Sequence, residues 1–358
     1  MFAQHRSHVS AALAFGLLIA MLPVATHAQT VAPTRSAVPG IWINKSELAA
    51  LSTSSTTWSK VKAAADTNLL GGVITTRDNH NVRVLAAALV AARLNSNTYR
   101  ARVRDALVSL MKGPVDTNDG LALLRRLGTY AVAADLIELK TFAPTVDTQF
   151  RAWLQKMRTV KFSGGGGGGT LITYHERRPN NFGTHAGFSR AAVALYLGDK
   201  TDLQRSAVVF KGWLGDRAAY TGFSYGSLWW HCDPSRPMGI NPPTCQMSNL
   251  NGALPDDQRR AGGYTWPPPK ENYVWEALQG AFAQAVVLHR AGYDPFAWQS
   301  KALLRAVQWL HVQAKYPAEG DDTWVPHIAN KYYGTSFPAP KPARPGKNAG
   351  YTDWTHTR

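Results

Sequence analysis

Apolar residues recur along most of this chain at the three- and four-residue spacing of an α-helix. Short turn signals such as Gly113-Pro114 and Phe142-Ala-Pro144 separate the periodic stretches. Cap-like residues agree with these boundaries, as in Ser46-Glu-Leu at the start of the first stretch. The pattern predicts helices over residues 46–70, 79–94, 98–111, 119–139, 143–157, 181–197, 202–214, 271–291 and 294–315.

The fold class follows from the kind of periodicity. No stretch alternates apolar and polar residues for long enough to predict a β-strand, so the chain is predicted to be all-α. Short turns between successive helices are typical of stacked antiparallel helix pairs, which form either an open solenoid or a closed toroid. No fixed repeat length is visible, so a regular repeat protein is disfavoured. We expect an (α/α) toroid or incomplete barrel.

The first 28 residues have the pattern of a secretory signal peptide. A weakly basic start at Arg6 precedes an apolar run over residues 11–24, which is too short for a membrane-spanning helix. We expect cleavage near Ala28, a periplasmic or secreted protein, and no membrane span. Residues 29–358 are expected to form a single toroid domain. Its irregular segment, residues 219–270, is dense in Gly, Pro, Trp and Tyr.

Charge and aromatic content bear on the partner. The formal net charge of +16 predicts an acidic partner, and an exported protein is not expected to meet nucleic acid. Twelve Trp and thirteen Tyr favour a polysaccharide, because aromatic faces stack on pyranose rings. The alternative is that many exported proteins are basic and that Trp also fills cores. The expected partner is an anionic polysaccharide, a polyuronate.

The two cysteines, Cys232 and Cys245, enclose a short Pro-rich loop. In an oxidising compartment a disulfide closing this loop is expected. Although His231 is adjacent, a second ligand pair at metal spacing is missing, so no metal site is predicted. No cofactor is expected either.

The stretch from Arg178 to Asp199 begins as a loop and continues as an apolar helix. Asn180 and Asn181 stand at the helix start, where Asn caps free backbone N–H groups. His185 is four residues beyond Asn181 and therefore shares its helical face. The two side chains are either a cap and a packed histidine, or part of a site.

Other candidates lie in and after the irregular segment. Arg259 and Arg260 could grip a carboxylate, or be solvated charges. Tyr273 follows three prolines and could relay a proton, or be a buried aromatic. The remaining candidates for substrate binding are Arg178, Asn180, Trp230, His231 and Tyr264. His231 and the adjacent Trp230 could line a sugar subsite, or merely pack.

These residues suit elimination better than hydrolysis. Hydrolysis of a glycosidic bond needs two carboxylates beside it, and no acidic pair stands out among Glu176, Asp233, Asp256, Asp257, Glu271 and Glu276. Elimination from a uronate needs groups that neutralise the C6 carboxylate, a base for the C5 proton and an acid for the leaving O4. Asn, Arg, His and Tyr can supply these roles.

Two segments resemble a known family. Asn180-Asn-Phe-Gly-Thr-His and the helix ending in Leu-Tyr-Leu-Gly-Asp199 are similar to the signature of the alginate-lyase-like superfamily, which includes polysaccharide lyase family five. Arg259-Arg260 and Glu271-Asn-Tyr-Val-Trp-Glu-Ala-Leu-Gln-Gly280 resemble that family's arginine segment and tyrosine helix. The resemblance is close in these segments and loose over residues 45–315.

The resemblance implies metal-independent β-elimination on an α/α toroid, giving 4,5-unsaturated ends. Asn181 would neutralise the uronate carboxylate with Arg260 or Arg259, and Tyr273 would relay the proton to the glycosidic oxygen. The family's histidine follows the Asn pair directly, but Phe182 occupies that position here. His185 would supply the imidazole instead, or Tyr273 would act as both base and acid. The departure suggests a polymer other than alginate, such as a glucuronate-containing exopolysaccharide.

Two other functions stay open at this stage. One is a glycoside hydrolase on the same toroid. The other is a non-catalytic polysaccharide-binding protein of an exopolysaccharide system. The type of fold does not separate them from a lyase, because one fold hosts many functions.

Overall fold

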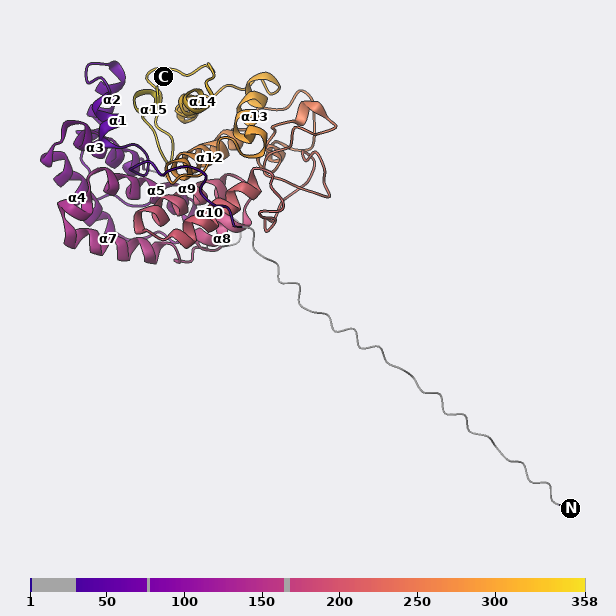
Figure 1. Cartoon of the computed structure of the whole chain (residues 1–358), viewed down its shortest axis with the longest axis horizontal. Helices are drawn as coiled ribbons and strands as arrows, with labels where there is room; N and C mark the ends of the chain where they lie inside the picture. Colours follow the sequence, from indigo (N-terminus) through magenta and orange to yellow (C-terminus); the bar gives the residue numbers. More distant parts are fainter. Residues whose placement is uncertain (2–29, 76–77, 164–167, 358) are drawn as a thin grey trace.

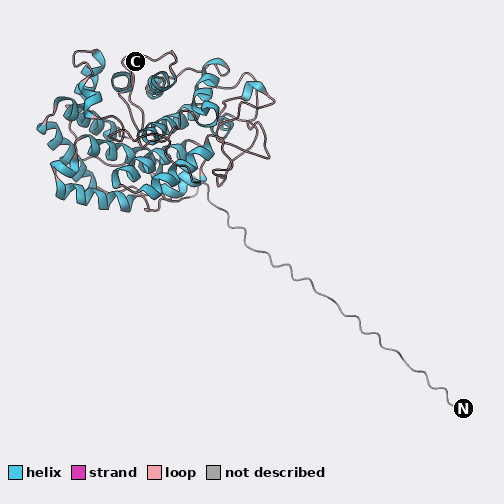
Figure 2. Ribbon diagram, in the orientation of Figure 1, coloured by secondary structure: helices cyan, strands magenta, loops and turns pink. Residues whose placement is uncertain are grey.

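A computed structural model describes residues 1, 30–75, 78–163 and 168–357 of the chain. Within these ranges the protein contains helices and no β-strand, which confirms the predicted all-α class. The predicted signal peptide, residues 1–28, lies outside the described ranges apart from Met1. Figure 2 shows helices throughout the body of the molecule and a group of long loops at one edge.

The helices agree with most predicted segments to within a few residues, and the caps explain their starts. Asn44, Ser55 and Ser96 each accept a hydrogen bond from a backbone N–H in the first turn of the helix that follows. The longer helices are α2 (Thr56–Ala65), α3 (His80–Leu94), α4 (Asn97–Lys112), α5 (Gly120–Leu136), α7 (Pro144–Met157), α9 (Asn181–Leu197), α10 (Lys200–Trp213), α12 (Asn272–Arg290), α13 (Trp298–Val312) and α14 (Val325–Tyr333). The shorter ones are α1 (Lys45–Ala49), α6 (Leu139–Phe142), α8 (Leu171–Arg177), α11 (Pro255–Gln258) and α15 (Thr352–Thr355).

Three differences from the predicted helices stand out. The single helix predicted over residues 46–70 is two helices, α1 and α2, separated by the Ser- and Thr-rich residues 50–55. Helix α8 was not predicted, although Thr170 caps it with a reciprocal pair of hydrogen bonds to Thr173. Helix α14 lies in the carboxy-terminal tail, after residue 315, where no helix was predicted. Short helices give too few turns for their periodicity to be recognised.

The helices form two layers. Nearly every residue of α3, α5, α9 and α12 is buried, so these helices form the inner layer. In contrast, α4 and α7 bury one face only and cover the inner layer from outside. Along the inner layer α3 contacts α5, α5 contacts α9, and α9 contacts α12 (Figure 1).

The carboxy-terminal helices close the ring. Helix α12 contacts α14, α14 contacts α15, and α15 returns to α2, which packs on α3. An aromatic contact joins α15 to α2, because Trp354 packs on Trp58 with ring centroids 5.0 Å apart. The elements therefore form the closed arrangement of stacked helices expected of a toroid (Figure 1).

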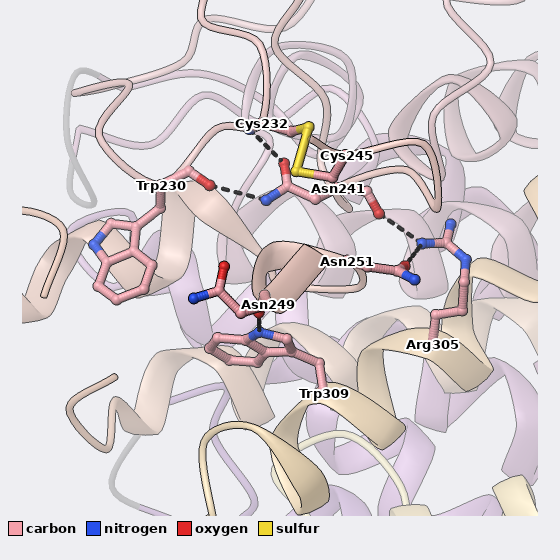
Figure 3. The surroundings of a disulfide bond; sticks show 8 residues. All are labelled: Trp230, Cys232, Asn241, Cys245, Asn249, Asn251, Arg305 and Trp309. Carbon is pink, nitrogen blue, oxygen red and sulfur yellow. Dashed lines mark hydrogen bonds between the residues drawn. A yellow bond between two sulfur atoms is a disulfide. The ribbon is translucent and has the colours of Figure 1, made fainter. Parts of the chain in front are cut away.

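The irregular segment, residues 219–270, lies at one edge of this ring (Figure 1). Its helical turns are limited to α11 and to the 3-10 turns η1 (Ser248–Leu250) and η2 (Arg259–Ala261). Figure 3 shows the disulfide between Cys232 and Cys245, whose Cα atoms are 5.4 Å apart, and this bond confirms the predicted pairing.

Candidate active site

Many of the buried polar residues of the inner helices lie near one end of the ring. Each inner helix is followed by an outer helix, and the inner helices point their amino-terminal ends toward the same end of the ring, although α3 begins beside the middle of α5, where Asn81 contacts Thr129. Glycine contacts confirm this direction for α9 and α12, since Gly280 packs on His185 and, one turn later, Gln284 packs on Gly187. These buried residues lie in the first two turns of α3 (His80, Asn81), α5 (Arg125, Arg126), α9 (Asn181, His185) and α12 (Glu276), and the half-buried Tyr273 lies in the first turn of α12.

Three of the four predicted catalytic residues come together at this end. Nη1 of Arg260 donates to Oδ1 of Asn181 at 3.5 Å. The guanidinium carbon of Arg260 lies 3.4 Å from the centroid of the Tyr273 ring, a cation–π contact. Asn181 is fully buried, Tyr273 is half-buried and Arg260 is exposed, so the cluster runs from the interior to the surface.

The backbone of Asn181 is held in place by a hydrogen bond to α11. Its backbone N–H donates to Oδ1 of Asp257 at 3.0 Å, so the α11 segment fixes the start of α9. Burial and the neighbouring Asp256 raise the pKa of Asp257 well above its usual range. Nδ2 of Asn181 has no hydrogen-bond partner among the described residues. A buried donor left unpaired costs stability.

His185 lies apart from these three residues, in a buried ionic cluster. Its Nε2 is 3.9 Å from Oε2 of Glu276, which is too long for a hydrogen bond. Glu276 also pairs with Arg125 and with Lys347, which reaches it from the carboxy-terminal tail. Neither ring nitrogen of His185 has a hydrogen-bond partner among the described residues, and the side chain has no exposed surface.

The protonation of this ionic cluster is clear. Burial lowers the pKa of His185 to about 4, although Glu276 opposes the shift, so the imidazole is neutral at pH 7. Burial alone would raise the pKa of Glu276. Its interactions with His185, Arg125 and Lys347 outweigh burial and hold that pKa well below its usual range. Glu276 is therefore an ion that the two cations stabilise.

Four of the predicted substrate-binding residues are engaged within the protein. Asn180 caps α9 by accepting from the N–H of Phe182 at 3.2 Å. Nε of Arg259 donates to Asp256 at 2.9 Å. Trp230 is fully buried and donates from its indole to the carbonyl of Gly262 at 3.0 Å. The ring of His231 is buried against Tyr225, with centroids 5.1 Å apart, and burial lowers the pKa of this histidine to about 4.

The other two, Arg178 and Tyr264, lie nearer to solvent. Arg178 is half-buried over the ring of Tyr174 and lines a very small cavity of about 10 Å³. Tyr264 is exposed and accepts from Asn249 at 3.0 Å through its hydroxyl. Of the six predicted substrate-binding residues, Tyr264 is the one that presents a ring to solvent.

Larger hollows lie away from the polar cluster. One of about 420 Å³ is lined by Asp135, Tyr196 and Arg290, which lie in the last turns of α5, α9 and α12. Another, of about 490 Å³, lies between Ser52 and Trp354. Volume alone would place a site at one of these hollows. We place it at the opposite end of the inner helices, because the groups that can neutralise a carboxylate and move a proton meet there.

The sequence did not reveal the partners of Glu276. Arg125 and Lys347 stand 151 residues before it and 71 residues after it, and only the closed ring brings them together. The one signal was Arg125-Arg126, two adjacent cations inside an otherwise apolar helix. Arg126 is buried, and its Nε and Nη1 have no hydrogen-bond partner among the described residues.

No protein-family model matches the chain, and no curated protein matches it. None of the helices in the described part of the chain is long and apolar enough to cross a membrane. Residues 30–75, 78–163 and 168–357 contain no group of three or more His, Cys, Asp and Glu placed to hold a metal ion.

Proposed function

We propose that the protein is an exported polysaccharide lyase that cleaves a uronate-containing anionic polysaccharide by metal-independent β-elimination. The observation that carries the proposal is the contact among Asn181, Arg260 and Tyr273. Two segments that are distant in sequence, the start of α9 and residues 260–273, bring together an amide, a guanidinium and a phenol. These are the groups, and the residues, that the resemblance to polysaccharide lyase family five assigns to the reaction.

The guanidinium of Arg260 suits the uronate carboxylate, and the buried Asn181 positions that guanidinium by accepting from its Nη1. Arg260 is exposed and forms no ion pair with a described carboxylate, so its charge is available to a ligand. The amino-terminal ends of the inner helices add positive potential at the same end of the ring. Neutralising the C6 carboxylate stabilises the enolate that forms when the C5 proton leaves.

Tyr273 is the group best placed to move the proton. In the proposed reaction a base takes the C5 proton, the electron pair forms the C4–C5 double bond, and the C4–O4 bond breaks as O4 accepts a proton. Tyr273 reaches the surface, whereas His185 has no exposed surface. We therefore assign both proton transfers to Tyr273 and give His185 a positioning role between α9 and α12.

Two of the candidate carboxylates support a hydrolase less well than the structure supports a lyase. Glu276 is ion-paired on two sides, and Asp257 is buried and accepts from the backbone of Asn181. Neither is free to act as the acid or base that hydrolysis requires. Export is supported by the signal-like amino terminus and by the disulfide, which is typical of oxidising compartments.

The test compares variants on a panel of polyuronates, following the ultraviolet absorbance of the unsaturated product. Tyr273→Phe removes only the hydroxyl and is expected to abolish formation of the unsaturated product. Arg260→Ala is expected to slow product formation at least tenfold, which corresponds to a loss of about 1.4 kcal/mol of transition-state stabilisation. Tyr99→Phe is the matched control, since Tyr99 is a half-buried tyrosine on the outer helix α4. Product release by Tyr273→Phe at the wild-type rate would remove this tyrosine from the mechanism.

A further inference from the structure

Two of the twelve tryptophans are exposed, and both lie in the irregular segment. Trp229 has 55% and Trp266 44% of its surface exposed, and Tyr264 beside them has 38%. The other tryptophans are buried or half-buried. Scattered apolar side chains on a surface are ordinary, but large aromatic rings gathered in one segment indicate a binding surface.

The three rings, Trp229, Tyr264 and Trp266, form what we call the aromatic platform. Residues 262–264 run beside residues 229–230. Trp230 donates to the carbonyl of Gly262 at 3.0 Å, and its ring meets Tyr264 edge to face with centroids 5.1 Å apart. A Cβ atom at Gly263 would lie 4.0 Å from the ring of Trp229. Trp229 and Tyr264 are therefore neighbours, and Trp266 follows two residues later.

The loop that follows Trp229 and Trp230 is braced (Figure 3). The disulfide closes the loop after Trp230, and Asn241 joins its two sides by donating to the carbonyl of Trp230 at 2.9 Å and accepting from the N–H of Cys232 at 3.1 Å. The loop is fixed to α13, since Arg305 donates to the carbonyl of Asn241 at 2.6 Å. Rings held by a fixed frame lose little conformational entropy when they bind a ligand.

The platform continues from the candidate active site. Trp266 is the sixth residue after Arg260, so their Cα atoms are at most about 20 Å apart. Aromatic faces suit pyranose rings, and exposed guanidinium groups with a formal net charge of +16 suit carboxylates. We infer that the aromatic platform binds the polyuronate chain beyond the bond that is cleaved. This inference takes its substrate class from the proposed function.

The test uses a Trp229→Ala/Trp266→Ala double variant of the full chain, with Leu94→Ala as the control. Leu94 has 46% exposure and ends helix α3. Affinity is measured by calorimetry for polymannuronate, polygalacturonate and polyglucuronate, with dextran as the neutral polymer. We expect each lost indole to weaken polyuronate binding roughly tenfold. KM for polymer is expected to rise while kcat stays unchanged. Circular dichroism checks that the variants are folded.

The outcomes separate the inference from the proposed function. Wild-type protein that binds a polyuronate without cleaving it would contradict the lyase proposal, and loss of that binding in the double variant would still support the platform. Binding by the double variant as tight as the wild type would overturn the inference, as would a wild type that binds no polyuronate. A wild-type dimer that becomes monomeric in the double variant would assign the rings to a self-interface, which also overturns it.

Discussion

Replacing Glu276 with Gln tests the buried ionic cluster. Glu276 is 3% exposed and pairs with Arg125, whose side chain is 8% exposed, and with Lys347. Gln keeps the shape but removes the charge, which leaves the buried guanidinium without an anion. Breaking a buried pair in this way costs about 3–5 kcal/mol. Because domains are typically stable by only about 5–15 kcal/mol, a large part of the free energy of unfolding would be lost.

Urea denaturation at pH 7, followed by circular dichroism, measures this loss. The matched control is Glu138→Gln, because Glu138 also pairs with two cations, Lys45 and Arg100, but is 48% exposed. An exposed ion pair contributes about 0–1 kcal/mol, so the control is expected to unfold nearly like the wild type. If Glu276→Gln were as stable as Glu138→Gln, the cluster would not hold the inner helices together as we describe.

Two further predictions concern stability. The pKa of His185 is about 4 in the folded protein and about 6.5 for an unperturbed histidine. Below pH 6.5 the unfolded chain therefore binds a proton that the folded chain does not bind. Wild-type stability should therefore fall from pH 6.5 to 4 by about 3 kcal/mol more than that of His185→Gln, and parallel pH profiles would contradict this. Replacing Cys232 and Cys245 with Ser should cost roughly 3 kcal/mol on the chain-entropy model, measured as a lower unfolding midpoint that reductant does not change further.

The sequence predicted the fold well where helices are long and capped. The helix predicted over residues 181–197 has those bounds in the structure, because Asn180 caps it and Gly198 ends it in the left-handed conformation. The 46–70 prediction joined two helices, since the intervening Ser and Thr residues do not break the apolar spacing strongly. Helix α8, with seven residues, is too short for its periodicity to show.

The site was predictable in part. The order of the motifs along the sequence singled out Asn181, Arg260 and Tyr273 as site residues. In the structure Arg260 contacts both of the others. Spacing on one helix also paired Asn181 with His185, but it could not show that the imidazole faces α12 and is sealed from solvent. The ion pair between Glu276 and Lys347 depends on how the tail crosses the ring, and no local pattern encodes that path.

The most direct test of the lyase proposal is the chemical identity of the product. Purified protein is incubated with each polyuronate of the panel, and the new chain ends are identified by mass spectrometry and ultraviolet absorbance. Elimination predicts oligosaccharides with a 4,5-unsaturated uronate, each lighter by one water than the product of hydrolysis. Saturated ends of hydrolytic mass would contradict the proposed reaction and indicate a glycoside hydrolase, and intact polymer that stays bound would indicate a binding protein.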